Sequence, residues 1–248
     1  MLIAKKQSQE CDLRKRFRKD RSTLGTRELD ERTSKRGSSQ VKYDVIYADP
    51  PWQFSSKRTG GSMKSGASQK YPTMTIDDLK KMPVGELASD NCYLIMWYVN
   101  AMPKEACELA EAWGFTVKNI NGLVWGKETV NGLPFFGLGY HTRAGTESAL
   151  IAVKGKPKPA SRSVRSFFTA PVGEHSAKPQ EGRDKVEKIA GRFARKLELF
   201  HRGKPRNGWD VFGNQSAPSL ILDEVGFRKP YLAEIQLQYE ELEKWKKN

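Results

Sequence analysis

Residues 43–52 read Tyr-Asp-Val-Ile-Tyr-Ala-Asp-Pro-Pro-Trp, an apolar run that ends abruptly in an acid, two prolines and a large aromatic side chain. A short run rich in β-branched and aromatic residues, bounded by prolines, predicts a buried strand that ends before Asp49. Each proline fixes its backbone φ angle, so the pair holds the Asp49 carboxylate and the Pro50 carbonyl in a rigid arrangement. Two hydrogen-bond acceptors are therefore fixed at the end of a strand.

This tetrapeptide suits the activation of an exocyclic nucleobase amine. Such an amine is a poor nucleophile because its lone pair is delocalised into the ring. Asp49 and the carbonyl of Pro50 can accept its two hydrogens and draw the lone pair back onto nitrogen. Pro51 keeps the turn rigid, and Trp52 can stack on a base that has left its helix. The same four residues also fit a plain strand end followed by a proline-rich turn, so the rest of the chain must decide.

Composition restricts the class of protein. The length of 248 residues favours one catalytic domain with extensions. The chain has 43 Lys and Arg against 29 Asp and Glu, and the net charge of +14 favours a polyanionic partner such as nucleic acid. Three cysteines and three histidines without metal-ligand or Cys-x-x-Cys spacing predict no disulfide framework and no metal, which fits a cytoplasmic location. The longest strongly apolar run, residues 92–99, is too short to cross a bilayer, so no membrane association is expected.

The chain divides into three parts. Residues 1–40 form a basic arm that we interpret either as a contact to phosphates or as a solvated helix face or disordered tail. Residues 41–216 form the catalytic domain, and residues 217–248 form a helical extension. The amphipathic helix at 231–247 is expected to pack back on the domain, and pairing with a second copy in a homodimer is the alternative.

Strands and helices alternate through the domain, which predicts an α/β fold with a mostly parallel sheet flanked by helices. Helices are predicted over 76–82, 101–113 and 179–194, and strands over 43–48, 91–98, within 115–125, and over 147–153, 164–169, 196–200 and 209–212. The segment 55–70, rich in Ser, Gly and Lys, is interpreted as a mobile lid, and 126–146 as a loop.

Local signals refine the helices. Thr75 resembles the start of a capping box for the first helix, and Asn100 is the expected N-cap of the second. On the third helix Val186, Ile189 and Phe193 fall on one face, which should be buried.

Several segments, taken in order, resemble one family. They are Ala48-Asp-Pro-Pro-Trp52, Tyr71-Pro-Thr-Met-Thr75, Leu94-Ile-Met-Trp97, Glu147 to Gly155, His175-Ser-Ala-Lys-Pro179, Lys196-Leu-Glu-Leu-Phe200, Arg202 and Trp209-Asp-Val-Phe-Gly-Asn-Gln215. Together they resemble the MT-A-seventy family, which comprises the catalytic subunits of mRNA N6-adenosine methyltransferases and their bacterial and phage relatives. The resemblance covers roughly residues 41–215.

The resemblance implies a Rossmann-like methyltransferase fold of the permuted β class that uses S-adenosylmethionine to methylate N6 of adenine. It implies that Asp49 accepts from the adenine amine, that Trp52 stacks on the extruded base and that Tyr71 lines the same pocket. The implied cofactor contacts are Lys178 with the carboxylate, Arg202 with the ribose or methionine end, and Asn214 and Gln215 with the ribose hydroxyls. Trp97 is expected in the core, and Glu147 either pairs with a basic residue or faces the acceptor pocket.

Alternatives remain open for the substrate. DNA is preferred because the short chain lacks an RNA-binding module, and RNA is the second choice. Methylation of cytosine N4 is a third, although enzymes of that kind usually carry serine in place of Asp49. A non-catalytic subunit that only presents nucleic acid is the alternative of a different class. Between Arg202 and Trp209 the chain also departs from the eukaryotic enzymes, which carry a His-Asn pair there for the cofactor.

Overall fold

The structure is a computed structural model, and it describes residues 41–53, 73–137, 141–173, 177–213, 219–223 and 226–230. Several predictions fall outside these residues: those on the arm 1–40, the lid 55–70, Tyr71, Asn214, Gln215 and the helix 231–247.

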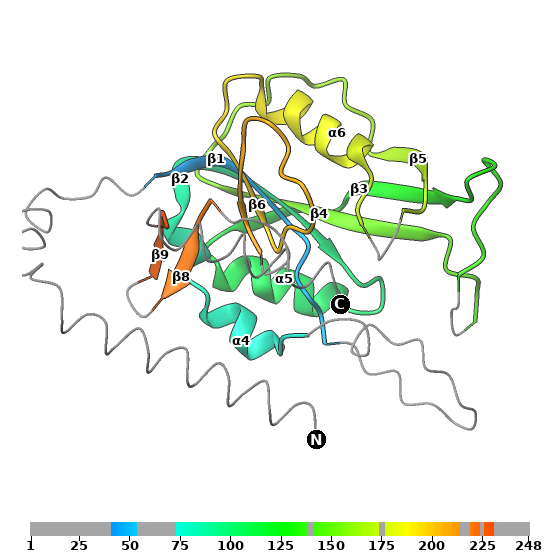
Figure 1. The fold of residues 1–248 in the computed structure, drawn as a ribbon, viewed down its shortest axis with the longest axis horizontal. Coiled ribbons are helices and arrows are strands. Elements are labelled where there is room, and N and C mark those ends of the chain that lie inside the picture. Colours follow the sequence, from blue (N-terminus) through cyan, green and yellow to red (C-terminus); the bar gives the residue numbers. More distant parts are fainter. Residues whose placement is uncertain are drawn as a thin grey trace, which may run out of the picture. The chain divides into compact units, whose positions relative to one another are not determined.

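A seven-stranded sheet forms the centre of the described domain, in the order β5-β3-β4-β2-β1-β6-β7 (Figure 1). Its strands are β1 Tyr43–Ala48, β2 Ala88–Tyr98, β3 Thr116–Glu128, β4 Thr146–Lys154, β5 Phe167–Pro171, β6 Lys196–Leu199 and β7 Trp209–Phe212. Strand β4 runs antiparallel to both of its neighbours, and the other four pairings in this sheet are parallel. The predicted mostly parallel α/β sheet is confirmed.

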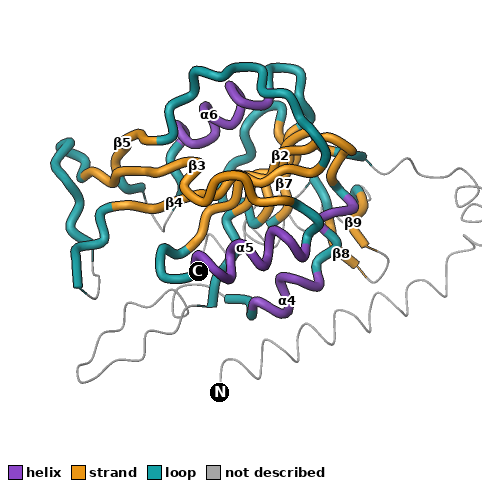
Figure 2. Tube along the Cα trace, turned by 180° about the vertical axis from the view of Figure 1, so that it is seen from behind, coloured by secondary structure: helices purple, strands orange, loops and turns teal. Residues whose placement is uncertain are grey.

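Helices cover both faces of the sheet. Helices α4 (Ile76–Lys81) and α5 (Pro103–Ala112) lie on one face and α6 (Gln180–Ala190) lies on the other, as Figures 1 and 2 show from opposite sides. Neighbouring β1 residues point to opposite faces, so Ile46 joins the core under α4 and α5 while Tyr47 joins the core under α6. Both side chains are fully buried. A strand that is apolar on both faces must be central, as the sequence predicted for β1.

The helix ends follow the capping signals in part. Thr75 caps α4 as predicted, because its hydroxyl accepts a hydrogen bond from the backbone N–H of Asp78 at 3.1 Å. The N-cap predicted for α5 was wrong, since the cap residue is Met102 and the Asn100 amide instead donates to the Thr146 carbonyl at 3.3 Å. Pro103 occupies the first turn, where its missing N–H leaves no intrahelical bond unmade.

Helix α6 is shorter than predicted. It ends at Ala190, and Gly191 follows with a φ of 94°, a conformation that favours glycine. Val186 and Ile189 are buried, but Phe193 lies beyond the helix end and is 93% exposed, so its predicted place on the buried face was wrong. The strand predicted at 164–169 is displaced to Phe167–Pro171.

The described part of the predicted helical extension is a hairpin. Strand β8 (Ile221–Asp223) pairs antiparallel with β9 (Gly226–Arg228). Phe227 is buried and its ring meets Phe212 edge-on with centroids 5.1 Å apart, so this hairpin packs on the end of the domain. No helix among the described residues is long and apolar enough to cross a membrane.

Strand pairing gathers several chain segments at one edge of the sheet. Ala48, the last residue of β1, is paired with Met96 of β2 and with Leu199 of β6. The chain leaves β1 towards β2 on one side and returns later as β6 on the other side. In open α/β sheets ligands bind at such a switch point, beyond the carboxyl ends of the strands. Because β4 is antiparallel, its amino end at Thr146 lies at this same edge.

Candidate active site

The Asp-Pro-Pro-Trp turn begins directly at the end of β1. The backbone N–H of Trp52 donates to the Pro50 carbonyl at 2.8 Å, and that of Met74 donates to the Pro51 carbonyl at 2.9 Å. The Asp49 N–H reaches the Leu199 carbonyl at 3.4 Å and so joins the turn to β6. The Pro50 carbonyl, which already accepts one hydrogen bond, has a second lone pair for another donor.

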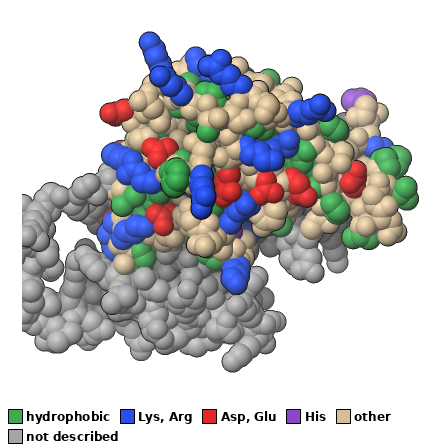
Figure 3. Space-filling view, turned by 90° about the horizontal axis from the view of Figure 1, so that it is seen from above, with side chains coloured by type: hydrophobic (Ala, Val, Ile, Leu, Met, Phe, Trp, Pro, Cys, Tyr) green, Lys and Arg blue, Asp and Glu red, His purple; other side chains and the backbone are tan. Residues whose placement is uncertain are grey.

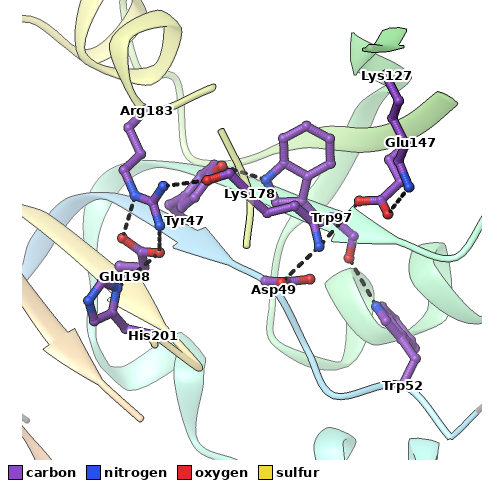
Figure 4. A network of polar contacts seen from close by, with 10 residues as sticks. All are labelled: Tyr47, Asp49, Trp52, Trp97, Lys127, Glu147, Lys178, Arg183, Glu198 and His201. Carbon is purple, nitrogen blue, oxygen red and sulfur yellow. Dashed lines mark hydrogen bonds and ion pairs between the residues drawn. The ribbon is translucent and has the colours of Figure 1, made fainter. Parts of the chain in front are cut away.

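Lys178 brings a positive charge to this turn. Its ammonium lies 2.8 Å from Oδ2 of Asp49 and 3.2 Å from Oε2 of Glu147, and Figure 4 shows it between the two carboxylates. The Lys178 side chain is 9% exposed, whereas those of Asp49 and Glu147 are each 26% exposed. The lysine is therefore held inside while part of each carboxylate remains accessible. Lys178 had been predicted to bind a cofactor carboxylate, and in this structure it contacts Asp49.

Glu147 also pairs with a second lysine. Its other oxygen, Oε1, accepts a hydrogen bond from Lys127 of β3 at 2.7 Å. Glu147 therefore pairs with basic residues, the first of its two predicted alternatives. Lys127 was not predicted from the sequence. The antiparallel pairing of β3 with β4 places Trp125 opposite Glu147, and Lys127 follows two residues later on β3. The pairing therefore brings Lys127 to Glu147, a relation that the charges in the sequence do not indicate.

Burial and charge oppose each other at these groups. Burial would lower the pKa of Lys178, but the charges of Asp49 and Glu147 outweigh it and raise that pKa, so the ammonium stays protonated. Burial would raise the pKa of Glu147, but Lys178 and Lys127 outweigh it and lower that pKa. For Asp49 burial dominates and raises the pKa, even though Lys178 and Arg202 act in the opposite direction. The pKa of Asp49 is thus raised by burial, while that of Glu147 is lowered by its two lysines.

Trp52 differs from the expectation of an open stacking platform. Its side chain is 6% exposed and belongs to the core under α4 and α5. Its indole N–H donates to the Trp97 carbonyl at 3.0 Å, and Trp97 in turn donates to the Tyr47 hydroxyl at 2.6 Å (Figure 4). An aromatic ring after two prolines can anchor the turn or face a ligand, and here it anchors the turn. Trp97 is 1% exposed, so its predicted place in the core is confirmed.

The segment after β6 also reaches the site. Arg202 lies near enough to Asp49 for its charge to lower the pKa of that carboxyl. Phe200 adopts a φ of 61°, the one positive value among the non-glycine residues that the structure describes. Backbone strain of this kind is common where a chain turns sharply at a functional site. The structure therefore brings Asp49, Lys178 and Arg202 together, while Tyr71, Asn214 and Gln215 fall outside the described residues.

A second charged cluster, which was not predicted from the sequence, is buried beneath the first. The Arg183 guanidinium binds both oxygens of Glu198, with Nε 2.9 Å from Oε2. Nδ1 of His201 lies 3.2 Å from Oε1 of Glu198, a close contact that is not a well-formed hydrogen bond. All three side chains are at most 9% exposed. The sequence carries one signal for this cluster, because Glu198 lies between two leucines of β6 and a buried glutamate is almost always paired.

The face of the domain that carries α6 is rich in basic side chains. Figure 3 shows Lys and Arg spread over this face, with a shorter row of acidic residues between them. Exposed basic residues between β4 and the end of α6 and just after it include Lys158, Arg162, Arg165, Lys188 and Arg192. Among the described residues there is no group of three or more His, Cys, Asp and Glu that could hold a metal ion.

Comparison with known proteins identifies the family. The sequence model named MT-A70 matches residues 43–215, more than half of the chain. The chain belongs to the MT-A70 family. Proteins of the MT-A70 family use S-adenosylmethionine as methyl donor, so the resemblance, the Rossmann-like fold and the cofactor inferred from the sequence are confirmed.

Relatives of the chain fall into two groups. It is 35% identical over 193 residues to the type II methyltransferase M.MunI of Mycoplasma sp, an alignment that covers 69% of this chain and 77% of that protein. It is 29% identical over 195 residues to a probable N(6)-adenosine-methyltransferase of Oryza sativa subsp. japonica, covering 77% of the chain and 25% of that protein. It is 26% identical over 188 residues to the N(6)-adenosine-methyltransferase catalytic subunit METTL3 of Homo sapiens, covering 73% of the chain and 30% of that protein. The chain thus spans most of M.MunI and less than a third of these two adenosine methyltransferases.

Proposed function

We propose that this protein transfers a methyl group from S-adenosylmethionine to the N6 amine of adenine in DNA. The observation that carries the proposal is the ion pair of Asp49 with Lys178, 2.8 Å apart at the carboxyl end of β1. The Asp49 carboxylate and the rigid Pro50 carbonyl lie at the switch point of the sheet, beside the buried ammonium of Lys178.

The charged pair fits the cofactor. The methionine end of S-adenosylmethionine carries an ammonium and a carboxylate, and the pair presents one opposite charge for each. Lys178 would hold the carboxylate and Asp49 would attract the ammonium. Lys178 retains Glu147 as a partner at 3.2 Å, so its ammonium stays compensated when Asp49 engages a ligand. Arg202, whose charge acts on Asp49, would contact the same ligand.

Catalysis then rests on alignment and polarisation by the chain's own residues. When bound, S-adenosylmethionine supplies an electrophilic methyl group, so no strong base is required. Lys178 occupies Oδ2 of Asp49, and we assign Oδ1 and the Pro50 carbonyl to the two amine hydrogens of adenine. These acceptors draw electron density onto N6, and the prolines keep them in place without reorganisation. Asp49, whose pKa is raised by burial, is suited to take the proton that the amine releases.

DNA is the substrate that we favour. The support is the alignment with the type II methyltransferase M.MunI, which has the highest identity of the relatives above and covers most of that protein. The basic face over α6 and the net charge of +14 suit a polyanion. A target adenine in a duplex must leave the helix, at a cost of a few kcal/mol. RNA is the second candidate, because two of the relatives above are named as adenosine methyltransferases.

Nucleoside mass spectrometry tests the proposal. Purified protein is incubated with S-adenosylmethionine that carries a deuterated methyl group and with double-stranded DNA, single-stranded DNA or RNA in parallel. We expect deuterated N6-methyldeoxyadenosine from DNA at a higher rate than N6-methyladenosine from RNA. Label in cytosine, or transfer to RNA alone, would overturn the assignment of base or polymer. Absence of any transfer, together with no cofactor binding by calorimetry, would instead indicate a non-catalytic subunit.

A further inference from the structure

The buried Arg183 makes one contact that its ion pair with Glu198 does not require. While Nε and one terminal nitrogen bind the Glu198 carboxylate, the other terminal nitrogen, Nη1, donates to the backbone carbonyl of Lys178 at 3.0 Å. The guanidinium thus joins β6 to the residue that supplies the ammonium of the site. A planar fork with several fixed donors can make both contacts at once.

The position of Lys178 needs such support. It precedes α6 by two residues, at a helix N-terminus whose partial positive charge disfavours a lysine. Its side chain must nevertheless extend inward to lie between Asp49 and Glu147. The bond from Arg183 fixes the backbone from which that side chain departs. Figure 4 shows Arg183 on the side of Lys178 away from Asp49.

Stability alone does not explain the buried pair. Replacing a buried ion pair by apolar side chains of similar volume is often neutral or stabilising. Arg183 and Glu198 could therefore be apolar without loss to the fold. What an apolar pair could not supply is the hydrogen bond to the Lys178 carbonyl. Arg183 also lies over the Tyr47 ring at 5.5 Å, so the same guanidinium borders the strand that ends in Asp49.

We propose that Arg183, held by Glu198, is a positioning residue that fixes Lys178 in its inward orientation between Asp49 and Glu147. Only the expected effect of Arg183 on cofactor affinity rests on the proposed function. The orientation of Lys178 itself is a property of the protein without ligands. It can therefore be measured independently of methyl transfer.

Two variants separate positioning from general stabilisation. Arg183→Lys keeps the charge beside Glu198, but a single ammonium lacks the fork that reaches the Lys178 carbonyl as well. The double variant Arg183→Met with Glu198→Met removes both charges and leaves no buried carboxylate without its partner. Both should keep a melting temperature within a few degrees of the wild type. Arg206→Met is the matched control, because Arg206 also binds α6, through Asp184 at 2.7 Å and Glu187 at 3.2 Å.

The first readout is trace acetylation of the ligand-free protein with acetic anhydride, quantified by mass spectrometry at Lys178 and normalised to the exposed Lys188. Wild-type Lys178, 9% exposed and paired with two carboxylates, should react slowly. We expect its reactivity to rise about threefold or more in both Arg183 variants, because local opening frees the side chain, and to stay unchanged in Arg206→Met. Wild-type reactivity at Lys178 in both Arg183 variants would overturn the inference.

The second readout is the affinity for S-adenosylmethionine by calorimetry. We expect about tenfold weaker binding in both Arg183 variants, at melting temperatures that show an intact fold. A wild type that binds no cofactor would contradict the proposed function, while the acetylation result would still decide the role of Arg183. Wild-type affinity in both variants would contradict that role.

Discussion

At the scale of single residues, the site depends on one ammonium that is shared by two carboxylates. Lys178 neutralises Asp49 and Glu147, and Lys127 of β3 supplies a second positive charge to Glu147. Glu147 therefore stays paired in the proposed complex, in which Oδ1 of Asp49 meets the ligand. Lys178 in turn keeps a second carboxylate partner there, so the buried ammonium stays compensated.

Lys178→Met should mainly weaken the binding of S-adenosylmethionine. The variant removes the positive charge that we propose for the cofactor carboxylate and leaves Asp49 near Glu147 without the cation between them. Repulsion between the two carboxylates raises their pKa values, so one of them takes up a proton. We expect an affinity lower by about 10-fold to 100-fold in calorimetry at pH 7.5.

Lys127→Met is the matched control, since Lys127 binds Glu147 and lies one step further from Asp49. Its cofactor affinity should change by less than about threefold. If Lys178→Met bound the cofactor as tightly as the control does, Lys178 would have no place in the cofactor site.

At the scale of elements, the close approach of α6 to the sheet depends on a glycine. A β-carbon at Gly182 would lie 2.9 Å from the Tyr47 hydroxyl and 3.3 Å from Cζ2 of Trp97. Both rings are buried and fixed to each other by a hydrogen bond. The sheet cannot accept a methyl group here without moving α6, which would also move Lys178.

Gly182→Ala should therefore destabilise the protein, although alanine favours helices more than glycine by about 1 kcal/mol. Overpacking costs about 1–3 kcal/mol and outweighs that gain, and we expect a lower melting temperature in calorimetry. Phe193→Ala, just beyond the end of α6, is the comparison variant. Phe193 is 93% exposed, so its loss should change stability by less than about 0.5 kcal/mol. A stabilised Gly182→Ala protein would show that the contact is not tight.

The contact between β6 and α6 predicts a dependence on pH. Burial would raise the pKa of Glu198, but His201 and Arg183 outweigh it and lower that pKa below its ordinary value of 4.5. Because this pKa is lowered in the folded state, the ionised carboxylate stabilises the fold above pH 4.5. That stabilisation is lost as the pH falls through the folded-state pKa. Glu198→Gln should be destabilised by about 2–4 kcal/mol at pH 7, with a smaller difference from wild type below pH 4.5.

Thermal unfolding of both proteins between pH 3.5 and pH 7.5 measures this difference. Glu181→Gln, in the exposed first turn of α6, is the control and should change stability by no more than about 0.5 kcal/mol. A Glu198→Gln penalty that is constant with pH, or that grows in acid, would contradict the assigned shift.

At the scale of the whole molecule, the sequence predicted the parts whose signals are local. Strand β1 is apolar on both faces and the two prolines mark its end, so the residues alone place Asp49 at the end of a central strand. The order of the family segments then indicated that Lys178 and Arg202 reach the same edge. The structure brings all three together.

What the sequence could not predict depends on pairing across the fold. Lys127 reaches Glu147 only because β4 is antiparallel to β3, and Arg183 meets Glu198 only because α6 packs on β6. Neither relation follows from spacing along the chain. Trp52 shows a different limit, since an aromatic residue after two prolines fits an anchor and a stacking surface equally well.

The basic arm gives a prediction for the whole chain, although residues 1–40 lie outside the described part. Residues 1–36 hold 12 Lys and Arg and six Asp and Glu. Deleting these residues should weaken binding to a DNA duplex and reduce the slope of log affinity against log salt by about 1 or more, because fewer counterions are released. Fluorescence anisotropy at salt concentrations from about 50 to about 300 mM measures this slope. An unchanged slope would mean that the arm does not contact phosphates.

Single-turnover methyl transfer by Asp49→Asn, compared with wild type at saturating S-adenosylmethionine and DNA, tests the central claim most directly. Asparagine keeps the size of the side chain and Lys178 keeps Glu147, so the fold should persist. Asparagine offers only a neutral amide oxygen, however, so the proposed polarisation of the adenine amine would be weakened. We predict N6-methyladenine at a rate lower by about 100-fold or more, with a melting temperature close to that of wild type. An Asp49→Asn rate within a factor of about two of wild type would contradict the claim that this carboxylate activates the amine.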